Sequence, residues 1–258
     1  MGSEAVRGKL RWASHHLDIL DNAVAEYVDP KNIGFIPKRH DHEKKLVWGH
    51  LTSKMGDAGL EVISHMFGDV LQSANSCLDC LVAELFVTNH PGEKAKPCHK
   101  FPLASSHGAF NKEIGSDTLY GIPFEAVSII EGLQAYKAGN DPVPAQLLAL
   151  RTLTNTHKHR KINVSVLTAN PAPSNLVPVE KDGEFFVRVG DLPKAVHHKA
   201  QIGPFPFTED GNVDVDRKYT AVIVLEESEF RDIPITVVAA RLVESVNEAF
   251  NRLLPFLR

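Results

Sequence analysis

The chain has 258 residues, of which 43% are hydrophobic and 23% are charged, and it carries a net charge of -4 at pH 7 with a pI near 6.3. These values are ordinary for a globular protein with a substantial core, and they exclude the strongly basic surface expected of a protein that binds duplex DNA. The three cysteines are an odd number, which favours a reducing compartment over a disulfide scaffold. We therefore expect a cytoplasmic protein.

The first residues lack the apolar segment of a secretory signal, and no uninterrupted apolar run reaches the roughly 20 residues that cross a bilayer. The sequence therefore predicts no membrane association. It also lacks the glycine-rich loops that hold nucleotide cofactors and the G-x-S-x-G turn of acyl hydrolases. We therefore expect no cofactor.

Four stretches have the apolar spacing of amphipathic helices. In residues 4–28 the apolar positions recur every three or four residues, until Asp-Pro at 29–30 ends the pattern. Residues 58–88 form the longest candidate, with enough additional apolar residues to predict a central, buried helix. Two further helices are expected at 123–136 and 144–160, and each begins with a proline.

Short β-type runs lie on both sides of this helical block. Two of them, at 32–39 and 44–52, predict a hairpin before the long helix. Four more follow the block, at 161–170, 184–190, 198–205 and 219–227. A closing helix carries its apolar residues on one face, at Val238, Leu242, Val246, Phe250 and Leu253.

The predicted fold class is therefore α+β. We expect a helical bundle built on a long central helix, with a mostly antiparallel β-sheet and a C-terminal amphipathic helix. Because strands from both ends of the helical block can share one sheet, we expect a single domain over residues 1–258. Its helical block extends to about residue 161, and its β-rich part with the closing helix covers about 162–258.

The helix at 144–160 ends in the densest group of polar side chains, RTLTNTHKHRKI. At about 100° per residue, His157 falls on the face that carries the leucines. Arg151, Asn155 and His159 share a neighbouring face, and Lys158 lies beside them. Such a face can bind a phosphate and hold a general acid or base near it. Cations at this end of a helix also act structurally, by meeting its partial negative charge, and both interpretations stay open.

Three cysteines and a histidine form a second candidate site. Cys77 and Cys80 are spaced C-x-x-C, and Cys98 and His99 follow, so four potential zinc ligands are present. The first two cysteines lie inside the long predicted helix rather than at a turn. We therefore favour small buried core residues, keep zinc as an alternative, and assign no metal.

Four motifs follow one another in a recognisable order: ANSCLDCLVAEL at 74–85, FPL at 101–103, IEGLQAY at 130–136 and LTNTHKHR at 153–160. The order resembles an uncharacterised bacterial protein group with a HEPN-like helical bundle, in which LRSALDHLVWEL, FPI, LQPY and a helix ending in NNIDKHR follow in the same way. The resemblance covers roughly residues 5–170. It implies a helical bundle, and some HEPN proteins are RNases with an arginine four to six residues before a histidine.

The chain departs from that group in the long helix, where the group's Arg and His correspond to Asn75 and Cys80. Arg151 and His157 have the RNase spacing, but chance alone predicts about as many such pairs as occur in this chain. Asp79 is kept. If Asp79 meets the 155–160 segment across the bundle, the two form a buried polar network that fixes the register of the helices.

The sequence favours a non-catalytic HEPN-like bundle of a bacterial cytoplasm that binds a protein partner or a small ligand, with a homodimer as the expected assembly. The first alternative is a metal-independent RNase in stress or phage defence, in which Arg151 or Arg160 holds phosphate, His159 is the acid or base and Asn155 orients it. RNA is then the partner. A zinc protein is the second alternative, so whether the chain is an enzyme stays open. The remaining candidate binding residues are Lys158, Arg160, Asp79 and His157.

Overall fold

The computed structural model describes residues 2–43, 46–115, 117–159, 162, 164–169, 179–181, 184–186, 202–206, 220–225, 230 and 233–257. The chain divides into two compact units. Unit 1 consists of Met1–Asp21, Ile63–Ile162 and Thr236–Arg258, and unit 2 consists of Asn22–Val62 and Asn163–Ile235. The predicted boundary near residue 161 follows chain order, whereas these units interleave. The single domain itself stays a prediction.

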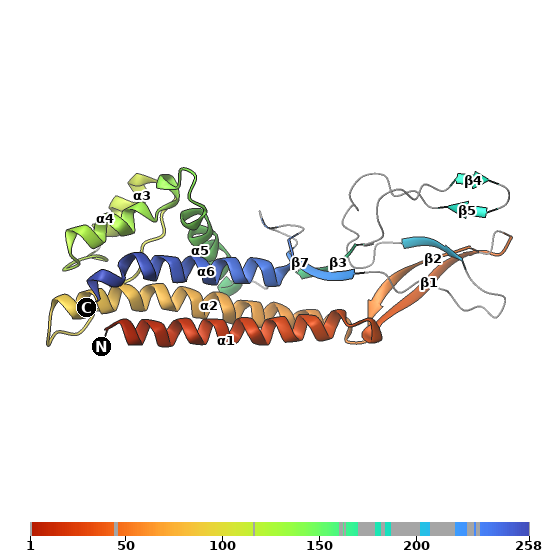
Figure 1. Cartoon of the computed structure of the whole chain (residues 1–258), viewed down its shortest axis with the longest axis horizontal. Helices are drawn as coiled ribbons and strands as arrows, with labels where there is room; N and C mark the ends of the chain where they lie inside the picture. The colour runs from red at the N-terminus through yellow and green to blue at the C-terminus, as the bar shows by residue number, and fades with distance from the viewer. Residues whose placement is uncertain are drawn as a thin grey trace. The chain divides into compact units, whose positions relative to one another are not determined.

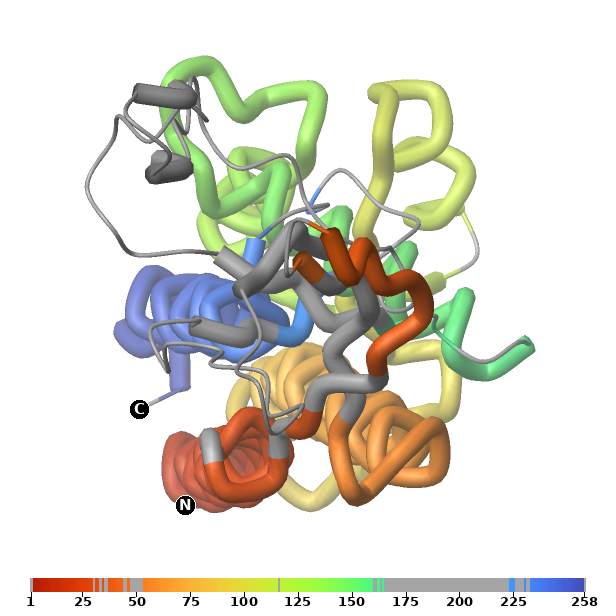
Figure 2. The backbone as a smooth tube through the Cα atoms, turned by 90° about the vertical axis from the view of Figure 1, so that its right-hand side faces the viewer, coloured from red at the N-terminus to blue at the C-terminus, as the bar shows by residue number. Residues whose placement is uncertain are grey.

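Within the described residues six α-helices are found: α1 (Gly2–Val28), α2 (Gly56–Asn89), α3 (His107–Ile114), α4 (Phe124–Gly132), α5 (Pro142–His159) and α6 (Ile235–Leu253). Three short 3-10 helices accompany them at Pro30–Asn32, Ala135–Lys137 and Leu254–Phe256. In unit 1, α1, α2 and α6 run side by side (Figures 1 and 2). The four helices that the apolar spacing predicts are confirmed to within a few residues, except that the third ends early and continues as a 3-10 turn.

The core of unit 1 is built around α2. Its buried side chains recur at every third or fourth residue from Ile63 to Phe86, as the sequence predicts for a central helix. Helix α1 contributes a narrower stripe, because Val6, Ala13 and Leu20 are fully buried at a seven-residue spacing. The backbone of α1 lies against α2 here, since the Cys77 thiol is 3.8 Å from the carbonyl oxygen of Val6.

Helix α6 completes this core. Its predicted apolar face is confirmed, because Val238, Leu242, Val246, Phe250 and Leu253 are all buried. The Arg252 guanidinium donates to the Asp141 carboxylate over 2.7 Å, which joins the end of α6 to the start of α5. The charge-assisted pair lies at the edge of the apolar contact.

Helix α2 is also long and apolar enough to cross a membrane, by length and composition alone: its best 18-residue window has a mean hydropathy of 1.3. This helix contains polar residues along its length, so it is not an uninterrupted apolar run, and the prediction of no membrane association is not tested by it. Half of that window is buried inside the structure, and the core helix of a soluble protein passes the same test. The finding is weak evidence for a membrane.

Unit 2 carries the strands. β1 (Ile33–Asp41) and β2 (Leu46–Ser53) form the predicted hairpin, and β6 (Ile202–Pro206) pairs with β2 on its other side. β3 (Val164–Ala169) pairs with β7 (Thr220–Leu225), and β4 (Val179–Lys181) pairs with β5 (Glu184–Phe186). All of these pairings are antiparallel.

The predicted fold class is wrong. The structure is mostly helical, and its described strands form no single, mostly antiparallel sheet on which an α+β fold could be built. They divide into three separate small sheets, one with three strands and two with two strands each. The physical reason is that strand pairing depends on distant parts of the chain. Alternating apolar residues predict that strands form but not that they join.

Candidate functional site

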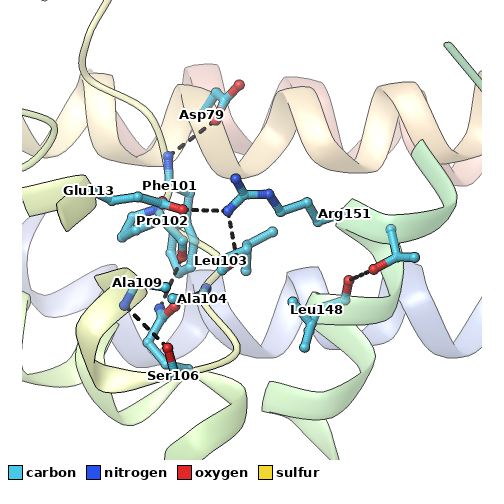
Figure 3. Close-up of polar contacts among 12 residues, drawn as sticks. Asp79, Phe101, Pro102, Leu103, Ala104, Ser106, Ala109, Glu113, Leu148 and Arg151 are labelled. Carbon is cyan, nitrogen blue, oxygen red and sulfur yellow. Dashed lines mark hydrogen bonds and ion pairs between the residues drawn. The ribbon is translucent and has the colours of Figure 1, made fainter. Parts of the chain in front are cut away.

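Residues 101–104, which we call the strap, run between α2 and α5 in unit 1 without forming a helix or a strand (Figure 3). Phe101, Pro102, Leu103 and Ala104 are all buried. A buried segment without secondary structure leaves its backbone donors and acceptors without partners from a ladder or a helix. Side chains of the neighbouring helices supply these partners.

The strap is bonded to α2 at its first residue, Phe101. The Asp79 carboxylate accepts a hydrogen bond of 3.1 Å from the backbone N–H of Phe101 (Figure 3). Burial raises the pKa of this carboxyl above its usual range, and the Phe101 amide and the nearby Lys100 partly offset the rise. Asp79 therefore anchors the strap at a cost in desolvation.

The strap is also bonded to α5. Nη1 of Arg151 donates to the backbone carbonyl of Leu103 and to a carboxylate oxygen of Glu113 in α3, both over 2.6 Å (Figure 3). Arg151 thus joins the strap, α3 and α5. Its charge is already matched by Glu113, so it is poorly placed to bind a phosphate unless that pair opens.

A third anchor comes from the IEGLQAY motif. Gln134 is fully buried, and its Oε1 accepts from the backbone N–H of Ala104 over 2.7 Å. Its Nε2 donates to the carbonyl oxygens of Pro102, over 3.0 Å, and Ile130, over 2.7 Å. The motifs that the sequence shows only in order therefore meet in space, around the strap.

A pocket of about 450 Å³ opens beside the strap, and we call it the strap pocket. Its lining residues come from α2, from the 97–103 segment, from α3 and the turn after it, and from α5: Asn75, Asp79, Pro97, Cys98, Lys100, Phe101, Leu103, Glu113, Thr118, Arg151, Asn155 and Lys158. Phe101, Leu103 and Thr118 are buried and form its floor, whereas Lys100, Asn155 and Lys158 are exposed at its rim. The volume lies within the range of small-molecule sites.

Four of the polar lining residues are available to a ligand. Among the residues that the structure describes, no hydrogen bond or ion pair is formed by the side chains of Asn75, Lys100, Asn155 or Lys158. The two amides lie on α2 and α5, and the lysines lie on the 97–103 segment and α5. The pocket thus combines donors and acceptors from three elements.

The structure separates the three predicted catalytic residues. Arg151 and Asn155 line the strap pocket, together with the predicted binding residues Asp79 and Lys158. His159, the predicted acid or base, is exposed at the last residue of α5 and is not among the lining residues. The predicted binding residue Arg160 lies outside the described residues.

His157 has a packing role. Its ring lies against α2 at Gly68, where a Cβ atom would overlap the imidazole, and it meets the His65 ring edge-on with centroids 6.2 Å apart. The prediction that His157 turns to the core side is confirmed by this contact. Burial is the main cause that lowers its pKa, and the neighbouring His65 adds to the effect.

The predicted direct link between Asp79 and the end of α5 is replaced by an indirect one. The hydrogen-bond partner that the structure gives Asp79 is the Phe101 amide, and no described side chain of residues 155–159 bonds to it. Helices α2 and α5 are instead joined through the strap, because Asp79 bonds to the Phe101 amide and Arg151 bonds to the Leu103 carbonyl.

The zinc alternative finds no ligand cluster. No group of three or more His, Cys, Asp or Glu side chains that could hold a metal occurs within the described part of the chain. Burial raises the pKa of the Cys77 thiol to about 12, so the free thiol stays protonated at neutral pH. His99 is buried against the Phe86 ring, with centroids 4.2 Å apart.

Sequence reasoning missed several residues of the site. Lys100, Glu113 and Thr118 line the pocket but belong to no motif, because only the path of the chain brings them there. Helix α3, which carries Glu113, lies in a stretch for which the sequence predicted no helix. Its signal was Ser106, whose side chain accepts from the Ala109 amide as a helix N-cap.

Comparisons of the whole chain with known protein families, with characterised proteins and with solved structures find no match. The strap pocket and its residues therefore carry the functional argument.

Proposed function

We propose that this chain is a non-catalytic helical bundle that binds a small ligand in the strap pocket. The carrying observation is that this pocket of about 450 Å³ is lined by four polar side chains without described partners: Asn75, Lys100, Asn155 and Lys158. A protein surface has no need to gather such groups around a concave site, and a ligand that pairs with them gains hydrogen bonds and orientation.

The anchors of the strap support a binding role over a catalytic one. Asp79, Gln134 and Arg151 spend their hydrogen-bonding groups on the strap backbone and on Glu113. They preorganise the pocket wall, which lowers the entropic cost of binding. A general acid or base must reach the bound molecule, and the predicted one, His159, lies outside the pocket.

The resemblance to HEPN-like bundles remains part of this proposal, as the origin that accounts for the four motifs. We also keep a bacterial cytoplasm as the proposed location, since Cys77, Cys80 and Cys98 are all free thiols. A homodimer and a protein partner stay predictions.

The RNase alternative remains a hypothesis with its own assay. Cleavage of single-stranded RNA that survives a chelator and is lost in His159→Ala would establish it and displace the binding proposal. We expect no such cleavage, because the described pocket holds Arg151 and Asn155 without a histidine.

The binding proposal is tested by a thermal-shift screen of small polar metabolites. A molecule that binds only the folded state stabilises it by about 2.7 kcal/mol when its concentration is a hundred times its Kd, and this stabilisation raises Tm. Asn155→Trp should fill the pocket and abolish the rise. Thr152→Ala, an exposed change on α5 outside the pocket, should keep it. If no molecule stabilises the protein, or if Asn155→Trp responds like the parent, the proposal fails.

A further inference from the structure

The charges of the strap pocket are unbalanced once its internal pair is set aside. Five charged side chains line it, namely Lys100, Arg151, Lys158, Asp79 and Glu113. Arg151 and Glu113 form an ion pair of 2.6 Å and so neutralise each other. The remaining charged groups are the two lysines and the partly buried carboxyl of Asp79.

That carboxyl does not neutralise the lysines. Asp79 uses one oxygen to accept the Phe101 amide, and within the described residues it forms no ion pair. Lys100 and Lys158 lie near enough to stabilise its charge, but neither forms a salt bridge with it among the described contacts. Lys158 lies on α5 and Lys100 lies in the segment just before the strap, so the two lysines reach the pocket from different elements of unit 1.

We infer that the strap pocket takes a small anion, with Lys100 and Lys158 both contacting its phosphate or carboxylate group and Asn75 and Asn155 hydrogen-bonding its polar edge. The inference rests on the proposed function and names the ligand class of the same site. Charge-assisted hydrogen bonds to lysine ammonium groups are the common means of holding phosphate and carboxylate in proteins.

The pocket suits a small molecule better than a polyanion. The chain carries a net charge of -4, so a nucleic-acid strand that extended beyond the pocket would meet a protein of its own sign. The carboxyls of Asp79 and Glu113 also lie in the pocket wall itself. A small anion can be held by the two lysines without covering this surface.

Asp79 gives the inference a signed test. Asp79→Asn removes a negative charge from the pocket while the amide oxygen can still accept from Phe101, so the strap anchor is kept. An anionic ligand then loses a repulsion and binds more tightly, by about fivefold for one charge near a solvated site. In the same variant a cationic ligand would bind more weakly, and the affinity for a neutral ligand would not change.

The experiment measures binding of inorganic phosphate and acetate to the full chain by isothermal titration calorimetry at low salt, with glycerol as the neutral probe. Lys100→Gln and Lys158→Gln should each weaken anion binding by about fivefold. Lys9→Gln, the same charge change at an exposed site on α1, should leave it unchanged. Both pocket lysines are exposed, so these variants should fold, and circular dichroism of each variant checks that they do.

The outcomes separate the two proposals. Anion binding that Lys158→Gln weakens and Asp79→Asn strengthens supports the inference. Anion binding that neither variant changes, an effect equal in Lys9→Gln, or tighter binding of single-stranded RNA than of both small anions overturns it. If the anions do not bind but a neutral molecule stabilises the protein and Asn155→Trp abolishes the effect, the inference fails while the proposed function stands. If no molecule binds in either experiment, both fail.

Discussion

Replacing Gln134 tests whether the strap is held as the structure shows. Gln134→Met keeps the length of the side chain and removes its hydrogen-bonding groups. The Ile130 carbonyl retains the Leu133 amide as a partner, at 3.2 Å. The Pro102 carbonyl and the Ala104 amide lose the partners recorded for them and stay buried.

The magnitude follows from those two groups. A buried backbone group that loses its partner costs about 1–3 kcal/mol, and the methionine adds little packing loss because its volume is similar. We therefore expect the free energy of unfolding to fall by about 2–5 kcal/mol in Gln134→Met. Such a loss is a large part of the stability of an ordinary domain.

Urea unfolding, followed by circular dichroism, gives the midpoint and the slope m for the parent and the variant. Gln72→Ala, an exposed substitution on α2, is the control and should change stability by less than about 0.5 kcal/mol. A loss in Gln134→Met of less than about 1 kcal/mol, with m unchanged, would refute the reasoning, because the strap would then have other partners.

Three further predictions concern the neighbouring helices. Gly68→Ala should destabilise the protein by about 1–3 kcal/mol despite the better helix propensity of alanine, because the new methyl group overlaps the His157 ring. Adding His157→Ala should recover most of this loss in urea unfolding. A double variant as unstable as Gly68→Ala alone would contradict the contact. The pKa of His157 is lowered by burial, so its protonation opposes folding, and stability should decline as pH falls through about 6.5; His157→Gln should flatten this decline, and an unchanged pH profile would argue against it. Burial raises the pKa of Asp79, so ionisation of this carboxyl opposes folding as the pH rises above the pKa of about 4 that it has in the unfolded chain. Asp79→Asn should therefore stabilise the protein at pH 7 and have a smaller effect at pH 4. Equal effects at both pH values would show that the charge is not the cause.

Sequence patterns predicted the helices of unit 1 well, for a physical reason. The apolar positions of α2 and α6 repeat at the helical period and are buried, so the local pattern already contains the packing information. Helix α3 is short and buries one side chain, Phe110, so its period is too weak to detect. The strands were predicted as runs, but their division into separate ladders depends on contacts far apart in the sequence.

The site was predicted in part. Helical geometry placed Arg151, Asn155 and Lys158 near one another on α5, and the motif order drew attention to Asp79, which lies on the same pocket. The role of the strap was not predicted, because nothing in FPL indicates that the strap backbone bonds to α2, to α5 and to Gln134 in the turn after α4. His159 shares a helix face with Arg151 and Asn155 by spacing, but it does not line the strap pocket. Helical spacing fixes the angle between residues and does not show how far along the helix the pocket extends.

The most direct test of the central claim is a measurement of where a small anion binds to the protein. Titration of the isotopically labelled protein with inorganic phosphate, followed by NMR, should shift the side-chain amide signals of Asn75 and Asn155 and the backbone signal of Phe101, while the signals of unit 2 stay in place. Shifts spread evenly over the surface lysines, or shifts that leave these three signals unmoved, would contradict a ligand site at the strap pocket.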